Sequence, residues 1–104
     1  MFDLTEEDVK AVYEQLKDRY HLVLTNTFAV DDGFEEDCPI LVGRRKGYIL
    51  WLYEWGGEFV LDVLNEEMTA GTHWHPNDVE QAVEDITDFF ENEPKYKLHR
   101  FPKR

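Results

Sequence analysis

Cysteine is almost absent from this sequence, in which Cys38 is the only one among 104 residues. A single thiol cannot form an intrachain disulfide, as is usual for proteins of the reducing cytoplasm. The first residues show no basic segment followed by an apolar run, so no secretory signal is expected. No apolar run approaches the roughly 20 residues that span a membrane. We therefore expect a cytoplasmic protein that does not enter a membrane.

Basic residues are scarce as well. The chain has 11 lysines and arginines against 23 aspartates and glutamates, which gives a formal net charge of −12. Such a charge repels a phosphate backbone, so nucleic acid is not expected as a partner. The same charge favours a basic protein partner, whose approach it would steer. The alternative is that the charge serves solubility alone.

Short motifs of common enzyme classes are also missing, among them a glycine-rich phosphate loop, Gly-x-Ser-x-Gly and Cys-x-x-Cys. Cys38 with His73 or His75 would make a thiol–imidazole pair. The acidic residues before Cys38 disfavour the thiolate that this pair needs. We therefore expect a binding protein rather than an enzyme, with no catalytic residues and no cofactor unless a transition metal such as zinc binds.

The sequence does have enough apolar residues, 42%, to build the core of one domain over residues 1–104. Apolar residues at helical spacing predict one helix over 5–19 and another over 77–92. Runs rich in β-branched and aromatic residues predict strands at about 21–30, 39–43, 48–55, 58–64 and 69–74. Gly56-Gly57, between two of these runs, indicates a two-residue hairpin turn.

This order of elements predicts an α+β domain. Each predicted helix has a single apolar stripe, and such a stripe is buried by packing on a sheet. We expect an antiparallel meander of four to five strands with both helices on one face, which is a two-layer sandwich. At the helix starts, Thr5 with Asp8 and Asn77 with Glu80 have the spacing of capping boxes.

The basic residues that do occur fall in two places. Arg44-Arg45-Lys46 is expected at a turn, where it would keep strand edges soluble. The basic tail, 95–104, holds five basic and no acidic side chains. We expect it to fold back along the acidic body or to fray, and its loose alternation of apolar and basic residues allows a short edge strand.

Thr72-His73-Trp74-His75-Pro76 is the stretch that most resembles a site. In an extended chain His73 and His75 point to the same side, and Trp74 points to the core. The two imidazoles could be metal ligands with Glu80 or Asp78 as the third, which would make a metal-binding protein or a metal-dependent hydrolase. The alternative is that one histidine packs at the helix start while the other is solvated.

His-x-His-x4-Glu is similar to part of the metal motif of cupins. A cupin places this motif between strands, whereas Glu80 here opens a predicted helix, and no second cupin motif appears. The resemblance therefore implies no cupin fold.

Residues 31–37 form an acidic segment that would suit a basic partner. Its acidic residues lack the regular spacing of a calcium loop, so we expect a solvated acidic loop. If the protein docks a basic partner, this loop is the first candidate for the docking surface. The candidate partner-binding residues are these carboxylates and two tryptophans of the third strand: Asp31, Asp32, Glu35, Glu36, Asp37, Trp51 and Trp55. Tyr48, Trp51, Tyr53 and Trp55 could instead form an aromatic sheet face that joins two copies, so the protein would be a monomer or a homodimer.

In size, charge and order of elements the chain resembles bacterial immunity proteins. That resemblance implies a small protein that neutralises a basic toxic nuclease by charge-complementary docking, and it assigns no residues. The Thr72-His73-Trp74-His75-Pro76 start of the last helix is similar to that of small acidic bacterial α+β proteins, which implies no particular activity. The double-stranded-RNA-binding domain has a shorter version of the same order, but the acidic charge opposes RNA binding.

Overall fold

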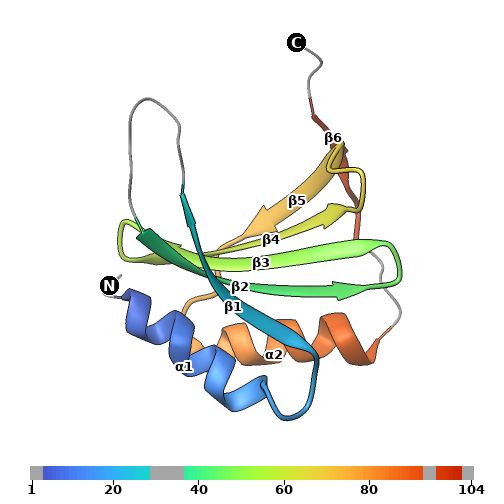
Figure 1. Cartoon of the computed structure of the whole chain (residues 1–104). Helices are drawn as coiled ribbons and strands as arrows, with labels where there is room; N and C mark the ends of the chain where they lie inside the picture. Colours follow the sequence, from blue (N-terminus) through green and yellow to red (C-terminus); the bar gives the residue numbers. More distant parts are fainter. Residues whose placement is uncertain (1–3, 29–36, 93–95, 102–104) are drawn as a thin grey trace.

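The structure, a computed structural model, describes residues 4–28, 37–92 and 96–101. Along the chain these residues form a helix, five strands, a second helix and a short last strand (Figure 1). The elements are α1 (Glu6–Leu16), β1 (Leu22–Phe28), β2 (Asp37–Arg45), β3 (Tyr48–Trp55), β4 (Glu58–Asn65), β5 (Ala70–Trp74), α2 (Val79–Glu91) and β6 (His99–Arg100). Within the described part of the chain, neither helix has the length and apolar character that crossing a membrane requires.

The strands form one antiparallel sheet in which every strand pairs with the next along the chain. The predicted α+β class and antiparallel meander are confirmed. The predicted count of four to five strands is wrong, because β6 adds a sixth strand beside β5, with Arg100 opposite Ala70. β6 is the short edge strand that the alternation in the tail allows, and it spans only two residues. Its place is fixed by backbone pairing, which the Phe101 N–H continues by donating to the Thr69 carbonyl at 2.9 Å.

Two tight turns set the register of β2, β3 and β4. Gly56 and Gly57 have φ angles of 60° and 83°, the positive values that a primed two-residue turn needs. The predicted glycine hairpin is therefore confirmed. Lys46 and Gly47, with φ angles of 47° and 85°, make a second such turn. As a result β2 runs to Arg45, beyond its predicted end at 43.

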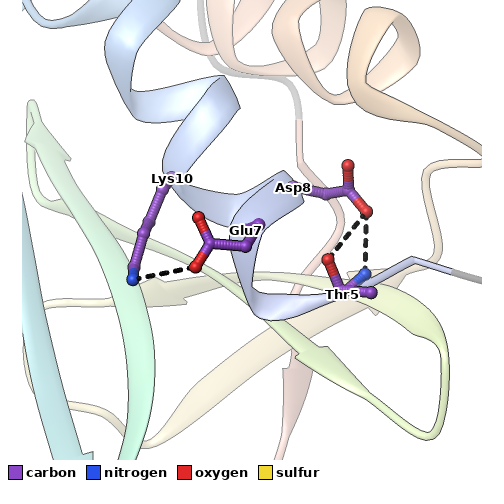
Figure 2. A network of polar contacts seen from close by, with 4 residues as sticks. All are labelled: Thr5, Glu7, Asp8 and Lys10. Carbon is purple, nitrogen blue, oxygen red and sulfur yellow. Dashed lines mark hydrogen bonds and ion pairs between the residues drawn. The ribbon is translucent and has the colours of Figure 1, made fainter.

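α1 begins after Thr5. The Thr5 backbone N–H donates to Asp8 Oδ2 at 2.8 Å, and the Thr5 hydroxyl lies 3.3 Å from the same oxygen (Figure 2). The predicted pairing of Thr5 with Asp8 is confirmed, and it satisfies a backbone donor at the helix start. The helix ends at Leu16 rather than 19, because the N–H groups of Arg19 and Tyr20 both turn back to the Leu16 carbonyl, at 3.0 and 3.1 Å.

The N-cap of α2 is one residue later than predicted. Asp78, not Asn77, is the N-cap, and its Oδ1 accepts the Gln81 N–H at 2.8 Å. Asparagine and aspartate cap helices about equally well, so the sequence does not separate two neighbours of these types.

The core lies between the helices and the sheet. Figure 1 shows α1 and α2 below the sheet, and the two helices contact each other. Their buried side chains join those of the sheet in one cluster, made of Val9, Val12, Leu16, Leu22, Leu41, Leu50, Leu52, Phe59, Leu61, Val63, Ala82, Ile86 and Phe89.

Gly43 allows Phe90 of α2 to pack closely against the sheet. A Cβ atom on Gly43 would lie 2.9 Å from Phe90 Cζ and 3.0 Å from Leu22 Cδ2. The Phe90 ring thus occupies the space that any side chain on Gly43 would need. On its other side Phe90 stacks on Tyr20, with ring centroids 4.6 Å apart. This contact joins α2 to both β2 and the segment after α1.

Arg45 binds the end of α2. Its Nη1 donates to the Phe89 carbonyl at 2.8 Å and also to the Asn92 carbonyl. The last carbonyls of a helix lack intrahelical donors and carry partial negative charge, so a guanidinium is favourable there. The prediction that 44–46 only keeps strand edges soluble is thus incomplete, because the longer β2 brings Arg45 to the helix.

The described part of the tail folds back rather than fraying. Tyr96 and Leu98 pack against the core cluster. The Tyr96 ring stacks on Trp74 and meets Tyr48 edge-on, each with centroids 6.0 Å apart. Burial, followed by the charges of Asp88 and Asp85, raises the pKa of Tyr96 to about 12.

Comparing Arg45→Ala with Arg44→Ala should separate the hydrogen bonds of Arg45 to α2 from the effect of removing one positive charge. We expect Arg45→Ala to lower the free energy of unfolding by about 1–2 kcal/mol, because the terminal carbonyls of α2 lose a charged donor. The matched control is Arg44→Ala, since Arg44 is exposed on the opposite face. Urea unfolding should show a change within about 0.5 kcal/mol for this control. Equal losses in the two variants would contradict the assignment.

Candidate functional site

The candidate site is the face of the sheet opposite to the one that joins the core cluster. Side chains alternate between the two faces of a strand, so the core cluster identifies the buried face. Strand register then places one set of residues on the other face. We call this set the open face: Val23, Thr25, Ile40, Val42, Arg44, Ile49, Trp51, Tyr53, Trp55, Glu58, Val60, Asp62, Leu64, Gly71 and His73. No described helix covers it (Figure 1).

Three aromatic side chains form a stripe along β3 on the open face. Trp51, Tyr53 and Trp55 are two residues apart, so they share this face. Trp55 is 58% exposed, and Val23, at the β1 edge of the face, is 49% exposed. Trp51 and Tyr53 are half-buried. Contiguous exposed apolar surface of this kind is typical of an interaction site.

Tyr48 does not belong to this aromatic face. The prediction that groups it with the other three aromatic residues is wrong, because Tyr48 is out of phase with them in the strand. It packs against the core cluster and meets Tyr96 instead.

One end of the open face is closed by the tail. Ile49 and Leu64 are paired across β3 and β4 and are buried, although they lie outside the main core cluster. A Cβ on Gly71 would lie 3.1 Å from Phe101 Cζ and 3.2 Å from Leu64 Cδ2. Phe101 thus covers Gly71 beside Leu64, and the accessible part of the face lies toward Trp51 and Trp55.

Asp62 lies in the middle of this apolar surface. It is opposite Trp51 on one side and opposite His73 on the other. Burial raises the pKa of the Asp62 carboxyl above its ordinary value. Three smaller effects oppose that rise: the charge of His73, a hydrogen bond from Tyr53 and the charge of His75. The surroundings of Asp62 therefore disfavour the charge that this residue normally carries.

His73 and His75 meet at the edge of the open face, as the alternation predicts. Their rings are edge-to-face with centroids 5.7 Å apart, and both residues are exposed. His75 Nδ1 lies 2.9 Å from the Phe59 carbonyl oxygen. Trp74 faces the core as predicted, and its Nε1–H donates to Asp85 Oδ2 at 2.8 Å.

The structure does not assemble the predicted third metal ligand. Glu80 is exposed in the first turn of α2, and Asp78 caps that helix. Across residues 4–28, 37–92 and 96–101, no group of three or more histidine, cysteine, aspartate and glutamate side chains is placed to hold a metal ion. The histidine pair therefore offers two ligands.

The acidic segment lies largely outside the described residues, which include none of Asp31, Asp32, Glu35 and Glu36. Asp37 and Cys38 are described only as positions at the start of β2. The docking role predicted for the acidic residues stays a prediction.

Asp62 is the residue that the sequence reasoning missed. The signal was present, since Glu58, Val60, Asp62 and Leu64 alternate with the buried Phe59, Leu61 and Val63. Placing Asp62 beside Trp51 requires the alternation of β4 to be combined with the register between β3 and β4.

Comparisons of the chain with protein-family models, with curated proteins and with solved structures found no significant match.

The position of Asp62 predicts a pH-dependent effect of Asp62→Asn. A carboxyl whose pKa is raised by folding contributes stability below its unfolded pKa of about 4, and this contribution is lost as pH rises through the folded pKa. We therefore expect the stability of Asp62→Asn relative to the wild type to be greater at pH ~7 than at pH ~3. Urea unfolding at the two pH values measures this difference.

Glu58→Gln is the matched control, because it removes one negative charge from the same strand and face. We expect a smaller pH-dependent difference for this control, because the predicted effect comes from the burial that raises the pKa of Asp62. A difference for Asp62→Asn that does not change with pH would contradict the assignment.

Proposed function

We propose that this protein is a cytoplasmic protein-interaction module that binds a basic protein partner through the open face. The observation that carries the proposal is the half-exposed aromatic stripe on a sheet face that no described helix covers. Tryptophan and tyrosine are the residues most enriched among those that dominate binding energy in interfaces. Trp51 and Trp55 are the anchors of this surface.

The two-layer arrangement is part of the proposal. Buried residues of both helices, such as Leu16 and Ile86, join the same cluster as Leu50 and Leu61 of the sheet. With both helices on one face of the sheet, the opposite face takes no part in the core between helices and sheet. Docking is the role that such a face supports.

Charge identifies the class of partner. The formal net charge of −12 attracts a cationic protein and accelerates its association. It opposes a homodimer, because two copies docked on their open faces would bring two charges of −12 together. The acidic residues Asp31, Asp32, Glu35, Glu36 and Asp37 would extend the contact beyond the aromatic stripe. An inhibitor of a basic enzyme, as immunity proteins are, is one form of this function.

Metal binding is the alternative function. The observation that favours it is the approach of the His73 and His75 rings to 5.7 Å between centroids. Imidazoles are ligands that Zn²⁺ accepts, and water or a partner's side chain would complete its coordination.

A photo-crosslinker on the open face should capture the partner. In this test Trp55 is to be replaced by p-benzoylphenylalanine, and cells that make the protein are to be irradiated. The crosslinked product is then identified by mass spectrometry. We expect a protein of positive net charge, because the field of this chain selects it. The same crosslinker at Glu84, which is exposed on α2, should not capture that protein.

The purified partner then gives a quantitative test. We expect Trp51→Ser to weaken its binding about 30-fold, the loss typical of an interface anchor. Met68→Ser is the control, since Met68 is an exposed apolar residue outside the open face. We also expect weaker binding as the salt concentration rises. Capture of a second copy of this chain, or capture only from position 84, would overturn the proposal.

Zinc titration by calorimetry tests the alternative. A metal centre predicts a dissociation constant of about one micromolar or lower for the wild type. It also predicts loss of binding in the variant with both His73→Ala and His75→Ala. If neither protein binds zinc at that level, the histidine pair has no metal function by itself.

A further inference from the structure

The centre of the open face combines features that recognise one kind of side chain. Across the sheet Trp51, Asp62 and His73 are successive neighbours in one row. Side chains directly opposite each other have Cβ atoms about 5 Å apart. A group that lies on the Trp51 ring can therefore reach the Asp62 carboxylate as well.

Tyr53 helps to fix the position of that carboxylate. It lies on the same face as Trp51 and two residues further along β3, opposite Val60. Its hydroxyl donates a hydrogen bond to Asp62. A carboxylate has two oxygens that together accept about four hydrogen bonds. Acceptor capacity therefore remains for an incoming donor.

Within the described part of the chain, no lysine or arginine charge acts on this carboxylate. Among the described residues, the cationic groups whose charge acts on Asp62 are His73 and His75. Arg44 lies on the same face but in another row, opposite Ile49. An external cation would therefore meet a carboxylate that is half-buried among aromatic rings, where charge attraction is screened less than at an open surface.

From this geometry we propose that Asp62, with Trp51 and Tyr53, is a binding site for an arginine side chain of the partner. The guanidinium lies on the Trp51 ring and donates to the Asp62 carboxylate. This inference rests on the proposed docking function and names the residue type that the partner must present at the centre of the contact.

Arginine fits better than lysine for two reasons. The guanidinium is planar, so it can stack on an aromatic ring and donate in its own plane at the same time. It also forms paired hydrogen bonds to a carboxylate, which an ammonium group cannot match in geometry. The chain already contains a cation–π contact of an arginine, with the Arg19 guanidinium 5.3 Å from the centre of the Tyr20 ring.

The probe is the blocked tripeptide acetyl-Gly-Arg-Gly-amide, titrated into the protein labelled with ¹⁵N and followed by NMR. We expect saturable shifts of the Trp51 indole N–H with a dissociation constant of about one millimolar, as befits a single side chain. The same peptide with citrulline, which has the shape of arginine without its charge, should cause no saturable shift. The lysine peptide should bind several-fold more weakly.

Two variants decide whether Asp62 is the ligand. Asp62→Asn should weaken binding of the arginine peptide about tenfold, since it removes the charged acceptor. Glu58→Gln removes the same charge from the same face and should change binding less than twofold. Equal weakening in the two variants would show attraction to the overall negative charge and would overturn the proposal, as would the absence of saturable shifts in the wild type.

The crosslinking experiment separates this inference from the proposed function. If Trp55 still captures a basic partner and Asp62→Asn does not weaken its binding, docking stands and the arginine site is wrong. If the peptide binds as expected and no partner is captured at Trp55, the arginine site stands and the docking function fails.

Discussion

The fit of Phe90 over Gly43 is the contact on which the arrangement of this protein depends. Because Gly43 has no side chain, the ring can come close enough that a Cβ there would lie only 2.9 Å from it. Arg45, two residues further along β2 and on the same face, then reaches the last carbonyls of α2. These contacts hold α2 to the sheet at β2 and bring it beside α1, whose buried side chains share its core cluster. With this face of the sheet occupied, the side chains that alternate with the core must point the other way. The open face is therefore a consequence of which side chains of the sheet join the core.

The composition of the open face is not what solubility alone would favour. A face exposed to water is usually polar, whereas Trp51, Tyr53, Trp55 and Val60 are apolar or aromatic. Asp62 is the opposite anomaly, a carboxylate whose charge is disfavoured by burial. Groups that reduce stability in this way concentrate at functional sites, although structural networks also shift pKa values. An aromatic stripe beside a half-buried carboxylate favours binding of a cation that also has an apolar or planar part. The docking proposal and the arginine proposal both rest on this combination.

Much of the fold could be predicted from the sequence because its signals are local. The helical spacing of Val9, Val12 and Leu16, the pairing of Thr5 with Asp8 and the Gly56-Gly57 turn each need only a few neighbouring residues. The features that could not be predicted depend on contacts distant in sequence. The tail allows a short edge strand, but its place beside β5 depends on the pairing of Ala70 with Arg100. The role of Arg45 depends on the end of a helix more than 40 residues away. The candidate site divides in the same way. The shared side of His73 and His75 follows from alternation within one strand, whereas the position of Asp62 between Trp51 and His73 requires the register of three strands.

The negative charge and the exposed aromatic face are best understood together. Exposed apolar surface on a sheet favours association with other copies of the same chain, and edge strands add to that hazard. At one edge of this sheet the short β6 carries the exposed His99 and Arg100, which limits further pairing there. Over the remaining surface, a net charge of −12 keeps copies apart at distances up to about a Debye length, roughly 8 Å at physiological salt. A cationic partner reverses the sign of that interaction while leaving the aromatic contact available. Under the docking proposal, the same charge suppresses self-association and selects the partner, and an exposed aromatic face is then compatible with a small acidic protein.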